Sequence, residues 1–169
     1  MVTYNGETFT AHETLTSVVD IEDVYQTMDK GLNDVLEFNV DYFDSANEEN
    51  FYFFKIKEQA DLFPTFFYIK DELVDGNLIN IFYERDEDED INQLEYKPGD
   101  AVDIEFYGIS EQYHDYIGLL IEQYGSAGDL FSSTPVQLKG NSVSIINPGN
   151  YAFGYFRATE VIKTTYTFQ

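Results

Sequence analysis

Alternating hydrophobic and polar positions dominate the chain and predict a protein built mainly of β-strands. Residues 36–41 give the clearest example, because Leu36, Phe38 and Val40 alternate with polar residues. This period of two is typical of a strand with one buried face. The same reasoning predicts further strands at residues 51–57, 64–70, 78–83, 101–109, 136–139, 151–158 and 161–168, and a linker with a short strand within residues 18–28.

One segment has a different period and predicts a single helix over residues 111–124. Tyr113, Ile117, Leu120, Ile121 and Tyr124 fall on one face at helical spacing. Ser110 stands at the N-cap position, and Gly125 provides the stop. The apolar face predicts that the helix packs against the sheet.

Together these elements predict an all-β fold, an antiparallel β-sandwich or open barrel, with one inserted α-helix near residues 111–124. The regular alternation of strand and helix that a parallel sheet requires is absent from the sequence. The chain is long enough for one domain of this kind.

The beginning of the chain predicts a β-hairpin. Asn5 and Gly6 form the type I′ turn signal between two short arms that are rich in Thr and aromatic residues. The first arm is very short, so we expect residues 1–17 to be the remnant of a preceding domain. Residues 18–169 would then form one β-rich domain, and the chain would be a fragment with an introduced Met1.

The strongly acidic composition limits the possible partners. The chain has 32 acidic and 9 basic residues, a net charge of -23, so nucleic acid is excluded as a partner and docking to an anionic membrane is disfavoured. It has no cysteine, which excludes disulfides and cysteine-ligated zinc. No apolar run approaches the length of a membrane helix.

Several short motifs in a fixed order resemble a Bacteroidota lipoprotein family, domain of unknown function 4249. The motifs are Y-N-G-E-T-F-T-A at residues 4–11, I-E-D-V-Y at 21–25, D-E-L-V-D-G at 71–76, K-P-G-D at 97–100, I-S-E-Q-Y at 109–113, P-V at 135–136, K-G-N at 139–141 and G-Y-F at 154–156. The chain resembles the C-terminal part of such proteins. Its first hairpin resembles the one that closes their N-terminal Ig-like domain, so the resemblance implies that residues 1–17 are the remnant of an Ig-like domain.

This resemblance implies a location outside the cytoplasm, at the outer membrane or cell surface. It also implies a lipid anchor, which this chain lacks, and a gene beside that of a TonB-dependent transporter. We therefore expect a non-enzymatic accessory or binding protein that acts with such a transporter or with an exported ligand. The alternative is a carbohydrate- or peptide-binding β-sandwich module, assisted by calcium.

Candidate metal ligands lie in the densest acidic run, with Asp86, Asp88 and Asp90 as the named positions. Calcium prefers several oxygen ligands, but five consecutive acids cannot all converge on one ion. We favour a solvated charged loop here, and the acidic loop at residues 44–49 is a weaker candidate still. His12 and His114 have no other ligands at metal-binding spacing, and we expect no other cofactor.

Candidate ligand-binding residues are the aromatic side chains Phe51, Phe53, Phe66, Tyr68 and Tyr83, which lie near predicted loops. Exposed aromatic rings can stack on sugars or peptides, although the period of two places most of them in the core. No catalytic residue is predicted, because the sequence lacks a nucleophile motif, a phosphate-binding glycine-rich loop and a His-Glu-x-x-His zinc motif.

Overall fold

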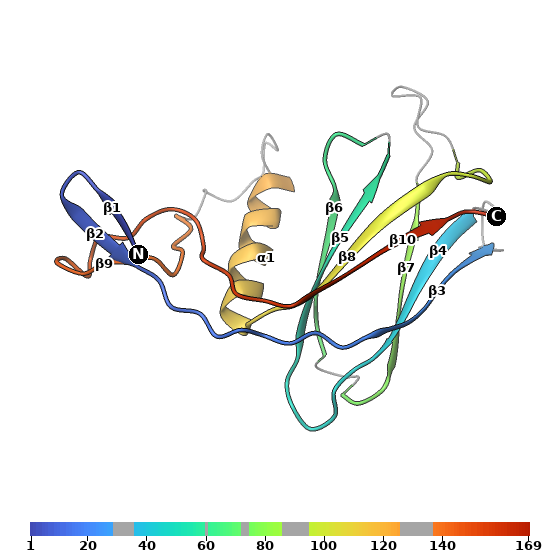
Figure 1. Cartoon of the computed structure of the whole chain (residues 1–169), viewed down its shortest axis with the longest axis horizontal. Helices are drawn as coiled ribbons and strands as arrows, with labels where there is room; N and C mark the ends of the chain where they lie inside the picture. Colours follow the sequence, from blue (N-terminus) through green and yellow to red (C-terminus); the bar gives the residue numbers. More distant parts are fainter. Residues whose placement is uncertain (29–35, 60, 72–74, 86–94, 126–136) are drawn as a thin grey trace.

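The fold is mainly antiparallel β-structure with one helix, as the sequence predicts (Figure 1). A computed structural model describes residues 1–28, 36–59, 61–71, 75–85, 95–125 and 137–169. The elements in these residues are β1 (Val2–Tyr4), β2 (Glu7–Thr10), β3 (Ile21–Met28), β4 (Leu36–Phe43), β5 (Phe51–Glu58), β6 (Thr65–Lys70), β7 (Leu78–Glu84), β8 (Ala101–Gly108), α1 (Glu111–Gly125), β9 (Val143–Ser144) and β10 (Val161–Thr167).

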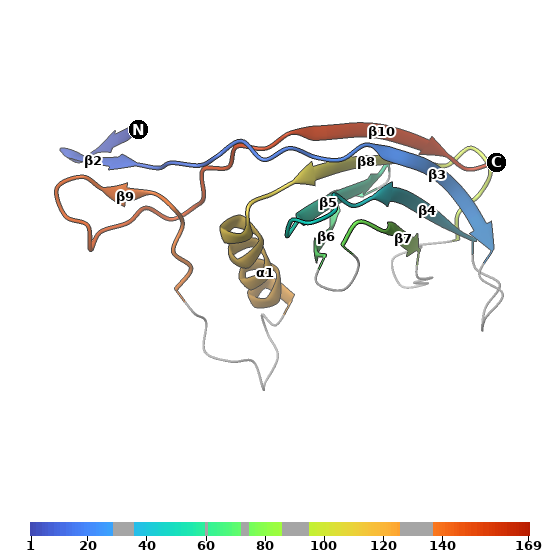
Figure 2. The same cartoon turned by 90° about the horizontal axis from the view of Figure 1, so that it is seen from below.

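The strands form three antiparallel sheets. The central sheet has the strand order β10-β8-β5-β6, the cover sheet has the order β3-β4-β7, and the outer sheet has the order β1-β2-β9. The central and cover sheets face each other as a sandwich, and the outer sheet lies apart from them beyond α1 (Figures 1 and 2). The sandwich does not close into a barrel, because β10 and β3 approach each other as unpaired edges.

Strand β5 lies at the centre of the molecule because both of its faces are buried. Tyr52, Phe54 and Ile56 point into the sandwich core, whereas Phe51 and Phe53 belong to a second cluster under the helix. The sequence F-Y-F-F-K-I-K-E therefore has aromatic residues at consecutive positions. A strand with one exposed face would instead alternate apolar and polar residues.

Helix α1 covers part of the outward face of the central sheet, against β5 and β6. Ser110 caps the helix as predicted, since its Oγ accepts a hydrogen bond from the Tyr113 amide at 3.3 Å. Ile117 is buried, and a Cβ placed on Gly118 would lie 3.1 Å from the Tyr68 ring. Because Gly118 has no side chain, the helix approaches Tyr68 closely and contacts the sheet through Ile117 and Gly118. Leu120 is 41% exposed, although its periodicity predicts a position on the docked face. No helix among the described residues is long and apolar enough to cross a bilayer.

The predicted hairpin at the beginning of the chain is confirmed. Asn5 and Gly6 have φ values of 50° and 77°, as a type I′ turn requires, and β1 pairs with β2. Strand β9 extends this pair into the outer sheet, with Phe9 opposite Ser144. The division into a domain remnant and one further domain stays a prediction.

Two expected strands near the end of the chain are not found in the described residues. Residues 137–139 and 151–158 are irregular, apart from isolated bridges at Tyr151 and at the following Thr159. The Phe156 amide donates to Asn141 Oδ1 at 2.9 Å, and Asn141 Nδ2 donates to the Phe156 carbonyl at 2.8 Å. The Asn141 side chain therefore makes the two hydrogen bonds that the backbone of a neighbouring strand would make. Gly154 also takes a φ of 97°, which interrupts an extended chain.

A three-strand ion network lies on the outward face of the central sheet. Glu105 in β8 contacts Lys55 of β5 at 3.0 Å and Lys163 of β10 at 2.6 Å. Hydrogen bonds from Lys163 and Tyr107, together with Lys55, lower the pKa of Glu105 from 4.5 to about 2. The charged form of Glu105 is therefore favoured by folding.

The docking of α1 predicts a contrast between two neighbouring substitutions. Ile117→Ala should lower the free energy of unfolding by about 2–4 kcal/mol, because it removes a buried side chain and leaves a cavity. Leu120→Ala, at the exposed position, should cost less than about 1 kcal/mol. Urea denaturation of both variants measures the difference, and equal losses would contradict this orientation of the helix.

The Glu105 network predicts a specific dependence of stability on pH. Because the pKa is lowered in the folded state, the stabilisation is complete above about pH 4.5 and is lost as the pH falls towards 2. Glu105→Gln should therefore be less stable than the parent by about 1–3 kcal/mol at pH 7, and the gap should vanish near pH 2. Denaturation across this range tests the prediction, with Glu22→Gln in β3 as an exposed control; a gap that does not change with pH would refute it.

Candidate functional site

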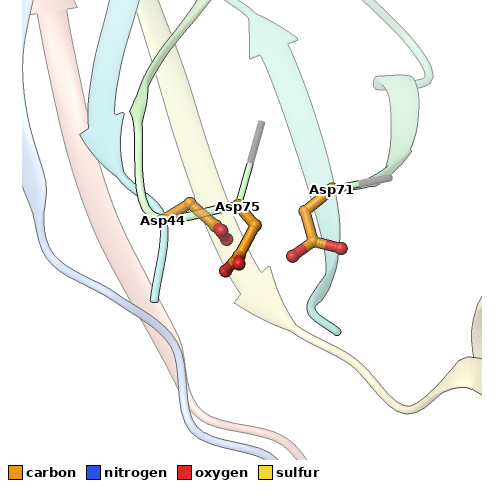
Figure 3. A group of neighbouring side chains, drawn as sticks. All are labelled: Asp44, Asp71 and Asp75. Carbon is orange, nitrogen blue, oxygen red and sulfur yellow. The ribbon is translucent and has the colours of Figure 1, made fainter. Parts of the chain in front are cut away.

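Three carboxylates from two separate parts of the chain converge at one end of the sandwich (Figure 3). Asp44 follows β4, Asp71 follows β6, and Asp75 precedes β7. One oxygen from each side chain lies within 4.8 Å of the others. We call these three residues the aspartate trio.

The strand pairing brings the trio together. Asp44 continues the pairing of β4 with β7, since its amide donates to the carbonyl of Asn77 at 3.0 Å. Asp71 continues the pairing of β5 with β6, since its amide donates to the carbonyl of Asn50 at 3.3 Å. Strands β4 and β7 belong to the cover sheet and β5 and β6 to the central sheet, so the trio lies where the ends of the two sheets meet.

Neutral donors hold two of the three carboxylates in place. The Tyr52 hydroxyl donates to Asp44 Oδ1 at 2.6 Å, and the Gly76 amide donates to Asp44 Oδ2 at 3.0 Å. The Asn47 amide donates to Asp75 Oδ1 at 2.8 Å. None of these donors carries a positive charge, so they orient the carboxylates without neutralising them.

Burial makes the trio electrostatically costly. Asp44 and Asp71 are 6% and 3% exposed, and Asp71 Oδ2 has no hydrogen-bond partner among the described residues. Burial raises the pKa of Asp71, and the charges of Asp44 and Asp75 raise it further, against a hydrogen bond from the Asn50 backbone. Two buried acids so close together are stable as anions only if a positive charge joins them.

A second unpartnered polar atom lies beside the trio. Tyr42 is fully buried, and no described residue forms a hydrogen bond with its hydroxyl. Its pKa is raised first by burial and then by the charges of Asp44 and Asp71, so the hydroxyl stays protonated next to these acids. The pKa of Tyr52 is raised likewise, by burial and by its hydrogen bond to Asp44.

Gly76 is needed for the loops at this site to approach each other. Its φ of 69° lies in the left-handed region, and a Cβ built on it would lie 2.7 Å from the Cβ of Ala46. Asn47, in the facing loop, also has a positive φ, at 68°. The turn that holds Asp75 can therefore lie directly against the loop that follows Asp44.

The chemistry of the trio suits the binding of a cation. It offers only oxygen ligands, which hard cations such as calcium prefer. The described neighbours include no histidine or serine nucleophile within hydrogen-bond reach of the three carboxylates. The arrangement can hold a cation or accept further hydrogen bonds.

The structure does not bring the five predicted aromatic residues together on one exposed surface. Phe51 and Phe53 are buried under α1, and Tyr68 packs against the helix at His114. Tyr83 packs against Phe38 and Phe67 at the sandwich core instead. Of the five, Phe66 is the one whose side chain is largely exposed, at 41%, and its ring stacks on Phe53.

The predicted metal ligands Asp86, Asp88 and Asp90 lie outside the described residues. His114 packs between the rings of Phe51 and Tyr68 and contacts Asp115, which is a structural environment. His12 is exposed and follows β2 of the outer sheet.

Sequence reasoning missed the aspartate trio because two strands, β5 and β6, separate Asp44 from Asp71 and Asp75. The acidic loop containing Asp44 was a weak candidate, and residues 75–77 read only as a turn. The available signal was that Asp44, Asp71 and Asp75 each stand at a strand boundary. This signal identifies the trio only when the strand pairing, which brings these strand ends together, is already known.

The chain belongs to the family described as domain of unknown function (DUF4249), which matches residues 1–165. This match covers nearly the whole chain and confirms the resemblance found in its motifs. No curated protein and no solved structure matches the chain.

The close approach at Gly76 predicts that this glycine cannot be replaced. Gly76→Ala should lower the free energy of unfolding by about 2–4 kcal/mol, because a positive φ is combined with a steric clash. Gly99→Ala is a matched control, since Gly99 also has a positive φ but no atom within 4 Å of a Cβ. Thermal denaturation of both compares them, and equal losses would mean that the contact with Ala46 contributes nothing.

Proposed function

We propose that this protein is a non-enzymatic accessory protein of the cell envelope that acts by binding a protein partner. The setting implied by the sequence resemblance is the outer membrane or cell surface, with a TonB-dependent transporter as the partner. The observation that carries the proposal is the uncovered apolar surface of the outer sheet.

The outer sheet has too little core of its own to account for its apolar residues. None of its described side chains belongs to either of the two hydrophobic clusters. Large apolar side chains are exposed on its strands and on the segments that follow β9; they are Met1, Val2, Tyr4, Val143, Ile145, Ile146, Phe153 and Phe156. An apolar surface of this kind is typical of a protein interface.

The edge of the outer sheet offers a second means of recognition. Strand β1 pairs with β2 on one side only, and all three of its residues are exposed. An edge strand with free backbone groups can accept a further strand from a partner. Backbone pairing along β1 together with burial of Val2 and Tyr4 would give such a complex both affinity and register.

The best-buried acids outside the trio support a binding role over a catalytic one, because their charges are already engaged. Glu58 pairs with Arg85 and accepts a hydrogen bond from the Tyr96 hydroxyl at 2.7 Å. Glu105 is held by two lysines and a tyrosine. Carboxylates bound in this way contribute to folding and are poor proton donors or acceptors for a substrate.

The aspartate trio favours a second candidate, a carbohydrate- or peptide-binding module assisted by calcium. A cation at that end of the sandwich would lie beside the loop at residues 44–50. The predicted aromatic residues give this candidate less support, because Phe51 and Phe53 are buried. We therefore keep the protein partner as the main proposal.

Site-specific photo-cross-linking in the cells that naturally produce the protein tests the proposal. A photoreactive amino acid is placed at Tyr4 or Phe153 in the full natural polypeptide, and adducts are identified by mass spectrometry. Lys57, an exposed position in β5, serves as the matched control. The proposal predicts adducts with an outer-membrane transporter from Tyr4 and Phe153, and no such adduct from Lys57.

The absence of adducts from both positions of the outer sheet, or adducts only between copies of the protein, would contradict a transporter partner. If Lys57 gives adducts with the transporter equally well, the outer sheet is not the surface that binds the partner.

A further inference from the structure

We propose that Asp44, Asp71 and Asp75 bind one calcium ion at the end of the sandwich. The inference does not rest on the proposed partner, because it concerns a different part of the molecule and can be tested on the purified chain. It also differs from the metal position suggested by the acidic run that contains Asp86, Asp88 and Asp90.

The spacing of the three carboxylates fits a single calcium ion. Calcium binds oxygen ligands at about 2.3–2.6 Å, so two oxygens on opposite sides of the ion lie about 4.8 Å apart. The three oxygens of the trio all lie within that distance of one another. They could therefore contact one ion without a rearrangement of the strands that carry them.

An unpartnered buried oxygen points to a ligand at this place. Asp71 is 3% exposed, and its carboxylate points towards Asp75 (Figure 3). Within the part of the chain that the structure describes, its Oδ2 has no hydrogen-bond partner. A buried carboxylate oxygen without a partner costs free energy, and a cation is the ligand that removes the cost most directly. The unpartnered Tyr42 hydroxyl lies in the same electrostatic environment, since the charges of Asp44 and Asp71 raise its pKa.

The surrounding hydrogen bonds place the ligands before an ion arrives. Tyr52 and the Gly76 amide each bind one oxygen of Asp44, and the Asn47 amide binds Asp75. The Asn50 carboxamide, in the orientation that satisfies its own hydrogen bonds, donates to Asp44 Oδ1 at 3.3 Å. Such outer contacts fix ligand direction in metal sites.

The ligand set selects calcium over other common cations. Zinc prefers histidine and cysteine; the chain has no cysteine, and neither His12 nor His114 belongs to the trio. Magnesium requires a tight octahedral shell at about 2.0–2.1 Å, whereas calcium accepts irregular sets of carboxylates, carbonyls and waters. Three carboxylates on loops correspond to the weaker calcium sites, with dissociation constants of about 10⁻⁵ to 10⁻³ M.

Isothermal titration calorimetry with calcium chloride in about 0.15 M salt tests the proposal, because this salt suppresses diffuse binding to the acidic surface. The proposal predicts one saturable site, weakened at least tenfold by Asp71→Asn and by Asp75→Asn. Asp75 is exposed, so its variant tests the site even if the buried substitution disturbs folding. Magnesium chloride should bind more weakly than calcium chloride.

Two control variants separate this site from other acids. Asp61→Asn, in the loop between β5 and β6 at the opposite end of the sandwich, should leave calcium binding unchanged. A combined Asp86→Asn, Asp88→Asn and Asp90→Asn variant should also bind calcium as the parent does.

A rise in melting temperature with calcium gives a second readout, which the Asp71 and Asp75 variants should lose. The proposal is overturned if the parent shows no saturable binding below about 10 mM calcium. It is equally overturned if Asp71→Asn or Asp75→Asn keeps the calcium affinity of the parent. The same holds if calcium binding is lost only in the variant that changes Asp86, Asp88 and Asp90.

Discussion

Burial of the central sheet on both faces is the constraint on which the rest of the structure depends. Strand β5 supplies Tyr52 and Phe54 to the sandwich core and Phe51 and Phe53 to the cluster under α1. A shift of one residue would exchange these two sets, so the register of β5 against β6 and β8 is strongly specified. The helix and the cover sheet are held against opposite sides of the same strands.

This register determines where the loops meet. Phe51 lies opposite Lys70, and the adjacent pair Asn50 and Asp71 continues this pairing. Phe43 lies opposite Leu78, and the adjacent pair Asp44 and Asn77 continues that pairing at the same end of the sandwich. The aspartate trio is therefore a consequence of the sheet pairing and not of a local sequence motif. The outer sheet has no comparable constraint, which is consistent with its exposed apolar side chains.

Much of the fold could be predicted from the sequence because its signals are local. The alternation in residues 36–41, the Asn5-Gly6 turn and the cap at Ser110 all reflect preferences of neighbouring residues. The strand expected at residues 151–158 was wrong because the Asn141 side chain replaces the backbone partner of Phe156. The trio could not be predicted, since its members are brought together only by the tertiary pairing of four strands.

The most direct test of this account is a crystal structure of the protein grown with terbium, which replaces calcium and scatters anomalously. The account predicts an anomalous peak between Asp44, Asp71 and Asp75, with β5 paired to β6 and β8 in the register described here. Carboxylates that lie apart, or a peak bound only by other acidic side chains, would contradict the claim that the central sheet assembles a cation site.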